Sequence, residues 1–103
     1  MKYGLKDDTM QKIRGVFTRF PAVTKAILYG SRAKGNFKSG SDIDLTLLGD
    51  SDLNLKELSE IISEMDDLLL PYTLDLSILS QISDQALREH IQRVGVIIYE
   101  RNI

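Results

Sequence analysis

The sequence of 103 residues contains no cysteine, only two prolines and only one histidine. Without cysteine, neither a disulfide framework nor a thiolate metal site can form, which is compatible with a reducing compartment. Pro21 and Pro71 each fall where a helical pattern stops and an extended pattern begins, so they mark boundaries between elements. We interpret the lone His90, which is far along the chain from any other candidate ligand, as a surface or helix-packing residue.

The chain also lacks an excess of positive charge and a long apolar run. Its 13 basic and 15 acidic residues give a formal net charge of −2, which argues against a domain that holds nucleic acid by its overall charge. Residues 1–10 lack the apolar stretch of a signal peptide, and the apolar stretch 96–99 is too short to span a bilayer. We therefore expect a cytoplasmic protein without membrane or stable nucleic-acid partners.

The length permits one domain, over residues 1–103, with an ordinary hydrophobic fraction of 43%. Apolar residues at helical spacing predict helices and alternating ones predict strands. The helices are expected near 7–20, 54–69 and 83–94, and the strands near 23–29, 42–48, 72–79 and 96–99. This order predicts an α/β (α+β) fold, with a mixed sheet of about four strands flanked by helices.

Cap residues and apolar stripes support the helix boundaries. Asn54 can cap the second helix, Ser83 or Asp84 can cap the third, and Gly95 ends the third. The second helix carries a stripe that we expect to be buried, with a docking surface as the alternative. Its members are Leu55, Leu58, Ile61, Ile62, Met65, Leu68 and Leu69.

The stretch GSRAKGNFKSGSDIDL, residues 30–45, carries the chemistry of this chain. Asp42 and Asp44 are two residues apart on the predicted strand 42–48, so their side chains leave the same face, about 6–7 Å apart along the backbone. A solvated polar face is the ordinary alternative. Asp75 adds a third acid on the polar face of another strand. If the two strands are neighbours, the three carboxylates repel one another unless divalent cations lie between them, and oxygen ligands suit Mg²⁺ or Mn²⁺.

The turn before the aspartates supplies a complementary site for an anion. Gly30 ends a predicted strand and lets the backbone approach a ligand closely. Ser31 offers a hydroxyl and an N–H group at a possible helix start, while Arg32, Lys34 and Lys38 add positive charge. Phosphate at the turn and metal at the aspartates together describe a nucleoside triphosphate with Mg²⁺. Two cations could then bind the attacking and leaving oxygens of a phosphoryl displacement.

Three rival motifs fit less well. A P-loop would need lysine and serine or threonine where Asn36 and Phe37 stand, and an EF-hand would need glycine where Leu47 stands. Asp42 to Thr46 also fits the D-x-D-x-T pattern of haloacid-dehalogenase-like phosphatases. In that family the aspartates follow an apolar strand, whereas here the apolar strand comes after them.

Gly30-Ser31, ten residues and then Asp42-Ile43-Asp44 match the G-S-x10-D-x-D signature of the polymerase-β-like nucleotidyltransferases. Over nearly its whole length the chain resembles the minimal members of that superfamily, the MNT-domain antitoxins that pair with HEPN-domain toxins. The GSRAKG form and the later Asp75 in YTLDLSIL agree with this resemblance.

The resemblance implies a set of roles. Asp42 and Asp44 would ligate two Mg²⁺ ions, and Asp75 would complete the metal site and favour deprotonation of an acceptor hydroxyl. Gly30 and Ser31 would hold the triphosphate of ATP, with Arg32 and Lys34 assisting. The reaction would transfer AMP from ATP, releasing pyrophosphate, to a tyrosine of the partner toxin, and so silence an RNA-cutting toxin.

Two alternatives stay open at the level of sequence. A non-catalytic antitoxin would mask its toxin sterically, although such a binder gains nothing from clustered acids. A small-molecule nucleotidyltransferase of the antibiotic-modifying type would complete its site with another subunit.

Overall fold

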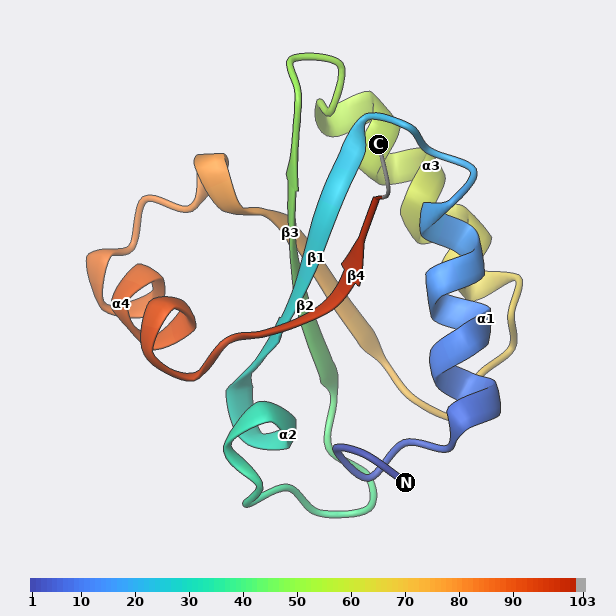
Figure 1. The fold of residues 1–103 in the computed structure, drawn as a ribbon, viewed down its shortest axis with the longest axis vertical. Coiled ribbons are helices and arrows are strands. Elements are labelled where there is room, and N and C mark those ends of the chain that lie inside the picture. Colours follow the sequence, from blue (N-terminus) through green and yellow to red (C-terminus); the bar gives the residue numbers. More distant parts are fainter. Residues whose placement is uncertain (102–103) are drawn as a thin grey trace.

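The computed structural model describes residues 1–101 and confirms the predicted order of elements (Figure 1). The elements are α1 (Asp7–Phe17), β1 (Val23–Tyr29), α2 (Gly30–Lys34), β2 (Ile43–Gly49), α3 (Leu55–Asp66), β3 (Leu74–Ile78), the 3-10 helix η1 (Leu79–Gln81), α4 (Gln85–Val94) and β4 (Val96–Glu100). The one helical turn expected after Ser31 is α2, whereas η1 replaces the end of the third predicted strand. Residues 102 and 103 of the predicted domain lie outside the described residues, and the single domain over 1–103 stays a prediction.

The four strands form one mixed sheet in the order β3-β2-β1-β4. β1 is antiparallel to β2 and to β4, whereas β2 and β3 are parallel. The parallel pair follows from its long connection through α3, which a tight hairpin could not provide. This sheet and its flanking helices confirm the predicted fold class.

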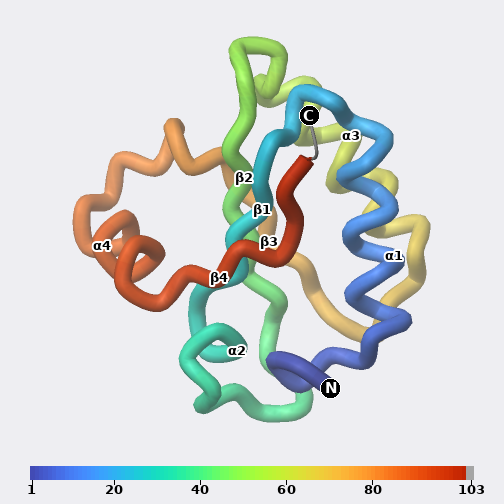
Figure 2. The backbone as a smooth tube through the Cα atoms, viewed as in Figure 1, coloured from blue at the N-terminus to red at the C-terminus, as the bar shows by residue number. Residues whose placement is uncertain are grey.

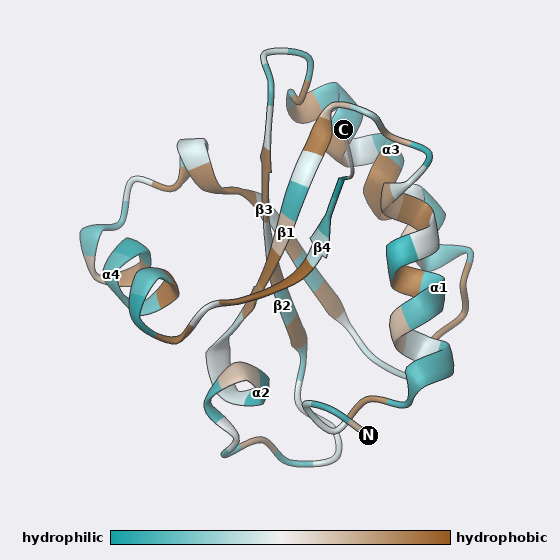
Figure 3. Cartoon of the chain, viewed as in Figure 1, coloured by the Kyte–Doolittle hydropathy of each residue, from teal (hydrophilic) through white to brown (hydrophobic). Residues whose placement is uncertain are grey.

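Two layers of helices lie on opposite faces of the sheet. Figure 1 shows α1 and α3 on one face, with α2 and α4 on the other. In β2, Ile43, Leu45 and Leu47 are 0% exposed and point toward α1 and α3, where Phe17 and Ile61 are also fully buried. Figure 3 shows hydrophobic residues along the strands and on parts of α1 and α3. Burial of this face supplies most of the driving force for folding.

Both predicted helix caps are present in the structure. The side chain of Asn54 accepts a hydrogen bond from the N–H of Glu57 at 2.9 Å. Oδ1 of Asp84, rather than the alternative Ser83, accepts from the N–H groups of Ala86 and Leu87 at 2.9 and 3.3 Å. These bonds satisfy N–H groups that a helix start leaves without a partner.

The predicted helix ends and the apolar stripe of α3 need correction. α1 ends at Phe17, and a turn in which the N–H of Phe20 bonds to the carbonyl of Phe17 still buries Phe20. Ile61 and Met65 are buried, but three other members of the stripe are exposed: Leu55 is 66% exposed, Ile62 39% and Leu69 87%. The stripe is wider than the face that contacts the sheet, and Leu69 follows the helix end with a positive φ of 54°.

Within residues 1–101, no helix combines the length and the apolar character needed to cross a lipid bilayer.

Candidate active site

Three polar side chains form a row across neighbouring strands at one end of the sheet. The antiparallel register places Tyr29 of β1 opposite Asp44 of β2, and the parallel register places Asp44 beside Asp75 of β3. Directly paired residues point to the same face of a sheet. The sequence left open whether the strands of Asp44 and Asp75 are neighbours, and the register shows that they are.

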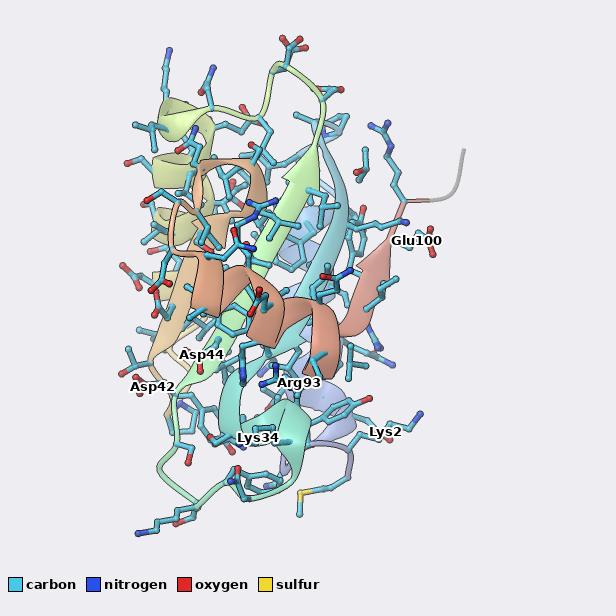
Figure 4. The ribbon with its side chains drawn as sticks, turned by 90° about the vertical axis from the view of Figure 1, so that its left-hand side faces the viewer. Lys2, Lys34, Asp42, Asp44, Arg93 and Glu100 are labelled. Carbon is cyan, nitrogen blue, oxygen red and sulfur yellow. The ribbon has the colours of Figure 1, made fainter. Side chains whose placement is uncertain are left out.

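Asp42 lies immediately before β2, not within it as predicted. The N–H of Ile43 donates to the carbonyl of Thr73 at 2.9 Å, so pairing with the segment before β3 begins one residue after Asp42. Figure 4 shows Asp42 and Asp44 close together where β2 begins, on the side of the sheet that carries α2 and α4. Because Asp42 is exposed, its carboxylate is free to turn toward a ligand at this end.

Electrostatic crowding is visible at Asp44. Partial burial raises the pKa of the Asp44 carboxyl above its ordinary value of 3.8, and the negative charges of Asp75 and Asp42 raise it further. The same environment raises the pKa of Tyr29, chiefly through burial, although its hydrogen bond with Ser77 opposes the change. A carboxylate crowded by two others is stabilised in its charged form when a cation is added.

The donor set at this end suits Mg²⁺ or Mn²⁺, since it consists of carboxylate oxygens. Within residues 1–101, however, no three acidic or histidine side chains converge closely enough to enclose a metal ion. This open arrangement is compatible with Mg²⁺, which usually keeps several waters and binds through one or two carboxylates together with phosphate oxygens of a substrate. The assignment of Asp42, Asp44 and Asp75 as metal ligands therefore stays a prediction.

Gly30 lies against the carboxylate of Asp44. Its φ is +75°, a conformation that glycine adopts readily, and a Cβ at this position would overlap Oδ2 of Asp44. The structure therefore gives a steric reason for glycine at this turn. The N–H of Gly30 is already used, because it donates to Nε2 of His90 at 3.1 Å. Gly30 thus lets the backbone lie close to the Asp44 carboxylate, but it does not offer a free N–H donor.

Ser31 and Lys34 lie in the short helix α2, directly after this glycine. Ser31 is half-buried and Lys34 is exposed. Figure 4 shows Lys34 on α2 with Arg93 of α4 above it. Contact of Gly30, Ser31 and Lys34 with a triphosphate remains a prediction.

Arg32 does not occupy the position predicted for it. Its side chain is 1% exposed, and its guanidinium donates to the carbonyls of Tyr3, Ser39 and Ser41. The guanidinium also lies 5.3 and 4.9 Å from the ring centroids of Phe37 and Tyr72. A guanidinium that is enclosed in this way cannot reach a bound triphosphate, so we correct its predicted role.

Arg32 instead fixes the loop that leads into the aspartates. The carbonyl of Ser41, which precedes Asp42, accepts from both Nε and Nη2 of Arg32 at 3.1 and 2.8 Å. Figure 2 shows the N-terminal segment lying beside the loop that follows α2, and the bond from Arg32 to Tyr3 at 3.0 Å joins the two. Arg32 therefore fixes the position of the backbone immediately before Asp42.

The structure adds residues that the sequence interpretation did not include. Thr46 is 0% exposed on the same face as Asp44, and Oγ of Ser77 donates to its Oγ1 at 2.9 Å. The alternating pattern of β2 and β3 could have indicated this pair. Thr46 and Ser77 each lie two residues after an aspartate, and therefore on the same face of the sheet as that aspartate. His90 offered no such signal, because its contact with Gly30 spans 60 positions of sequence.

Comparisons with known proteins identify the family to which this chain belongs. The family model described as "Polymerase beta, Nucleotidyltransferase" matches residues 11–103. A protein of Haemophilus influenzae, named "Probable protein adenylyltransferase MntA", is 37% identical over 76 residues, which cover 71% of this chain. The match spans only 63% of that relative's length.

Similar solved structures come from toxin–antitoxin complexes. One, a toxin–antitoxin with AMP-PNP, has a TM-score of 0.70 at 20% identity, covering 95% of this chain and 76% of its own. Another contains a tri-AMPylated Shewanella oneidensis HEPN toxin with an MNT antitoxin. Its TM-score is 0.69 at 18% identity, with 94% of this chain and 74% of its own covered. At these identities the likeness establishes the fold. The family model, which matches residues 11–103, shows that the chain belongs to the polymerase beta nucleotidyltransferase family.

Proposed function

We propose that this chain transfers AMP from ATP to a tyrosine hydroxyl of a HEPN-type toxin and thereby acts as its antitoxin. The observation that carries the proposal is the paired register of Asp44 and Asp75, with Gly30 packed against the Asp44 carboxylate. That arrangement puts crowded acids next to a glycine-serine turn. The names of the Haemophilus influenzae relative and of the similar complexes support the choice of AMP and of a toxin acceptor.

The residues of the chain divide the work of this reaction. Gly30, Ser31 and Lys34 hold the triphosphate, and Asp75 accepts the proton of the acceptor hydroxyl. The acceptor oxygen forms a bond to the α-phosphorus, the bond from that phosphorus to its bridging oxygen breaks, and pyrophosphate leaves with the electron pair. Asp42 and Asp44, with Asp75, would hold Mg²⁺, which neutralises charge that develops on the attacking and leaving oxygens when it is bound.

The acceptor side of the site is open in this fold. Asp42 and Asp75 are both exposed, so a hydroxyl on a second protein can approach them. Residues 1–101 leave this side of the site uncovered, and we therefore assign the binding of the acceptor to the toxin. The cytoplasmic location expected from the sequence suits such a partner and stays a prediction.

The decisive experiment combines this chain, Mg²⁺ and the HEPN-domain protein encoded beside it with ATP labelled at the α-phosphate. We expect label on the toxin with the α-phosphate probe and none with a γ-phosphate probe, because adenylyl transfer retains only the α-phosphorus. Asp44→Asn should abolish labelling, whereas Asp52→Asn, at an exposed loop position, should not change it. Equal labelling by wild type and Asp44→Asn would contradict the proposal.

The same experiment separates the two alternatives that the sequence left open. A non-catalytic antitoxin would neutralise its toxin without label, and the double variant Asp42→Ala/Asp44→Ala would still neutralise it. A small-molecule transferase would leave the toxin unlabelled and consume ATP only when a hydroxylated small acceptor is supplied.

A further inference from the structure

His90 of α4 bonds to the glycine-serine turn of the site. Its Nε2 accepts a hydrogen bond from the backbone N–H of Gly30 at 3.1 Å. Because an N–H group is the donor, Nε2 carries no proton, and the hydrogen of the neutral imidazole lies on Nδ1. The half-buried His90 is thus held in one tautomer by the backbone of the site.

The ring of His90 is also fixed by packing. It meets the ring of Tyr29 edge to face, with centroids 6.2 Å apart and planes at 80°. Tyr29 precedes Gly30 and pairs with Asp44 across β1 and β2. His90 therefore contacts both residues at the junction between β1 and α2, through its ring and through its nitrogen.

The hydrogen bond from Gly30 to His90 acts on a residue that has no side chain to restrict its backbone conformation. Gly30 has a positive φ of 75° and no Cβ, and its Cα lies against the Asp44 carboxylate. Glycine loses more conformational freedom on folding than any other residue, so an external bond is needed to hold one conformation. A change at Gly30 would move Ser31, the next residue, relative to Asp44.

We propose that His90 is a positioning residue: through its Nε2 acceptor it fixes the Gly30–Ser31 turn against Asp44, in the geometry that receives a magnesium–nucleotide complex. The inference rests on the proposed function for the identity of that ligand. His90 acts through Gly30 and does not contact the nucleotide. α4, which lies far from the turn in sequence, thereby becomes part of the nucleotide site.

Three substitutions separate this role from simple packing. His90→Phe keeps an aromatic ring beside Tyr29 but removes the acceptor. His90→Gln loses the ring and offers a carbonyl oxygen at a similar reach. Glu89→Gln is the matched control on the same helix, because Glu89 is exposed and its side chain bonds only to Gln85 within the described residues.

The first measurement is amide hydrogen exchange of Gly30 by NMR, which needs no enzymatic activity. Loss of one intramolecular hydrogen bond should speed exchange of this amide about tenfold in His90→Phe. His90→Gln and Glu89→Gln should exchange within about threefold of wild type. Unchanged protection in His90→Phe overturns the inference.

The second measurement is the affinity for Mg²⁺ with α,β-methylene-ATP, whose α–β link cannot be cleaved in the proposed reaction. We expect about tenfold weaker binding for His90→Phe, in line with one lost hydrogen bond, and recovery to within about threefold in His90→Gln. In turnover, KM for ATP should rise while KM for the toxin stays unchanged. A smaller folded fraction would instead lower kcat with both KM values unchanged, and that result overturns the inference.

The outcomes for the two proposals differ. If wild type transfers AMP and His90→Phe binds the analogue as tightly as wild type, the positioning role falls and the proposed function stands. If wild type binds no nucleotide, both the proposed function and the positioning role are contradicted, whatever the exchange rate of the Gly30 amide.

Discussion

Arg32 and Asp44 are the two single residues on which the local geometry of the site depends. Arg32 holds the loop before Asp42 from a buried position, and Asp44 contacts the turn at Gly30 while it is repelled by neighbouring acids. The first stabilises the fold and the second weakens it. Substitutions at these two positions should therefore change stability in opposite directions.

Replacement of Arg32 by alanine should destabilise the protein strongly. It would leave the carbonyls of Tyr3 and Ser41 without their donor and empty the space between two aromatic rings. We expect a loss of about 3 kcal/mol in the free energy of unfolding, measured with urea. Lys38→Ala, at an exposed position in the same loop, should stay within about 0.5 kcal/mol of wild type. A similar, small effect of both variants would contradict the role assigned to Arg32.

Asp44→Asn should stabilise the metal-free protein, and more so at neutral than at acidic pH. The pKa of Asp44 is raised on folding, so the folded state binds the proton more tightly than the unfolded state. Its contribution to stability therefore falls as the pH rises from 3.8 through the raised value.

Urea unfolding of both proteins across this range, without divalent cations, measures the effect. Because all other groups are shared, the stability difference between variant and wild type should grow with pH and then level off. A difference that is independent of pH would show that the charge of Asp44 carries no penalty in the fold.

At the scale of elements, α4 is a short helix with a large role. Only Ile91 of its residues is buried, yet the helix carries the His90 bond to Gly30. Its start depends on Asp84, whose side chain satisfies two N–H groups. The sequence allowed either Ser83 or Asp84 as the cap, and the two residues offer a direct comparison.

Asp84→Ala should lower the free energy of unfolding by about 1 kcal/mol, because it removes the cap of α4. Ser83→Ala should have no measurable effect, since Ser83 is exposed and precedes the cap. Thermal unfolding of the three proteins at the same pH measures both effects. A larger loss in Ser83→Ala than in Asp84→Ala would mean that the helix starts at a different residue from the one described.

At the scale of the whole molecule, one face of the sheet forms the core and the other carries the candidate site. The face toward α1 and α3 is apolar and fully packed, while Asp44, Thr46 and Asp75 lie on the opposite face, the one that carries α2 and α4. The acids add electrostatic cost that the apolar layer offsets. A ligand that binds these acids only in the folded state should therefore stabilise the entire domain.

Magnesium with α,β-methylene-ATP should raise the free energy of unfolding by about 2.7 kcal/mol at a hundredfold excess over its dissociation constant. The double variant Asp42→Asn/Asp44→Asn should show little of this increase at the same concentrations. Calorimetric melting with and without the ligands provides the comparison. Equal stabilisation of both proteins would place the nucleotide elsewhere than at these acids.

Short-range patterns in the sequence were sufficient to predict the strands and to single out the three candidate acids. The alternation of Ile43, Leu45 and Leu47 sets which face of β2 is buried, and the same alternation places Asp44 on the opposite face. Gly30 was also recognised from the sequence as the residue that ends a strand, whereas its contact with the Asp44 carboxylate is shown only by the structure.

Contacts between distant groups could not be predicted in this way, because segments far apart in sequence are brought together by packing that no local period encodes. The pairing of β2 with β3 placed Asp75 beside Asp44, and the docking of α4 brought His90 to Gly30. Arg32 turned inward because the carbonyls of Tyr3 and Ser41 and two aromatic rings surround it there. Those partners come from three separate segments, and burial of a guanidinium is stable only when all of them are present.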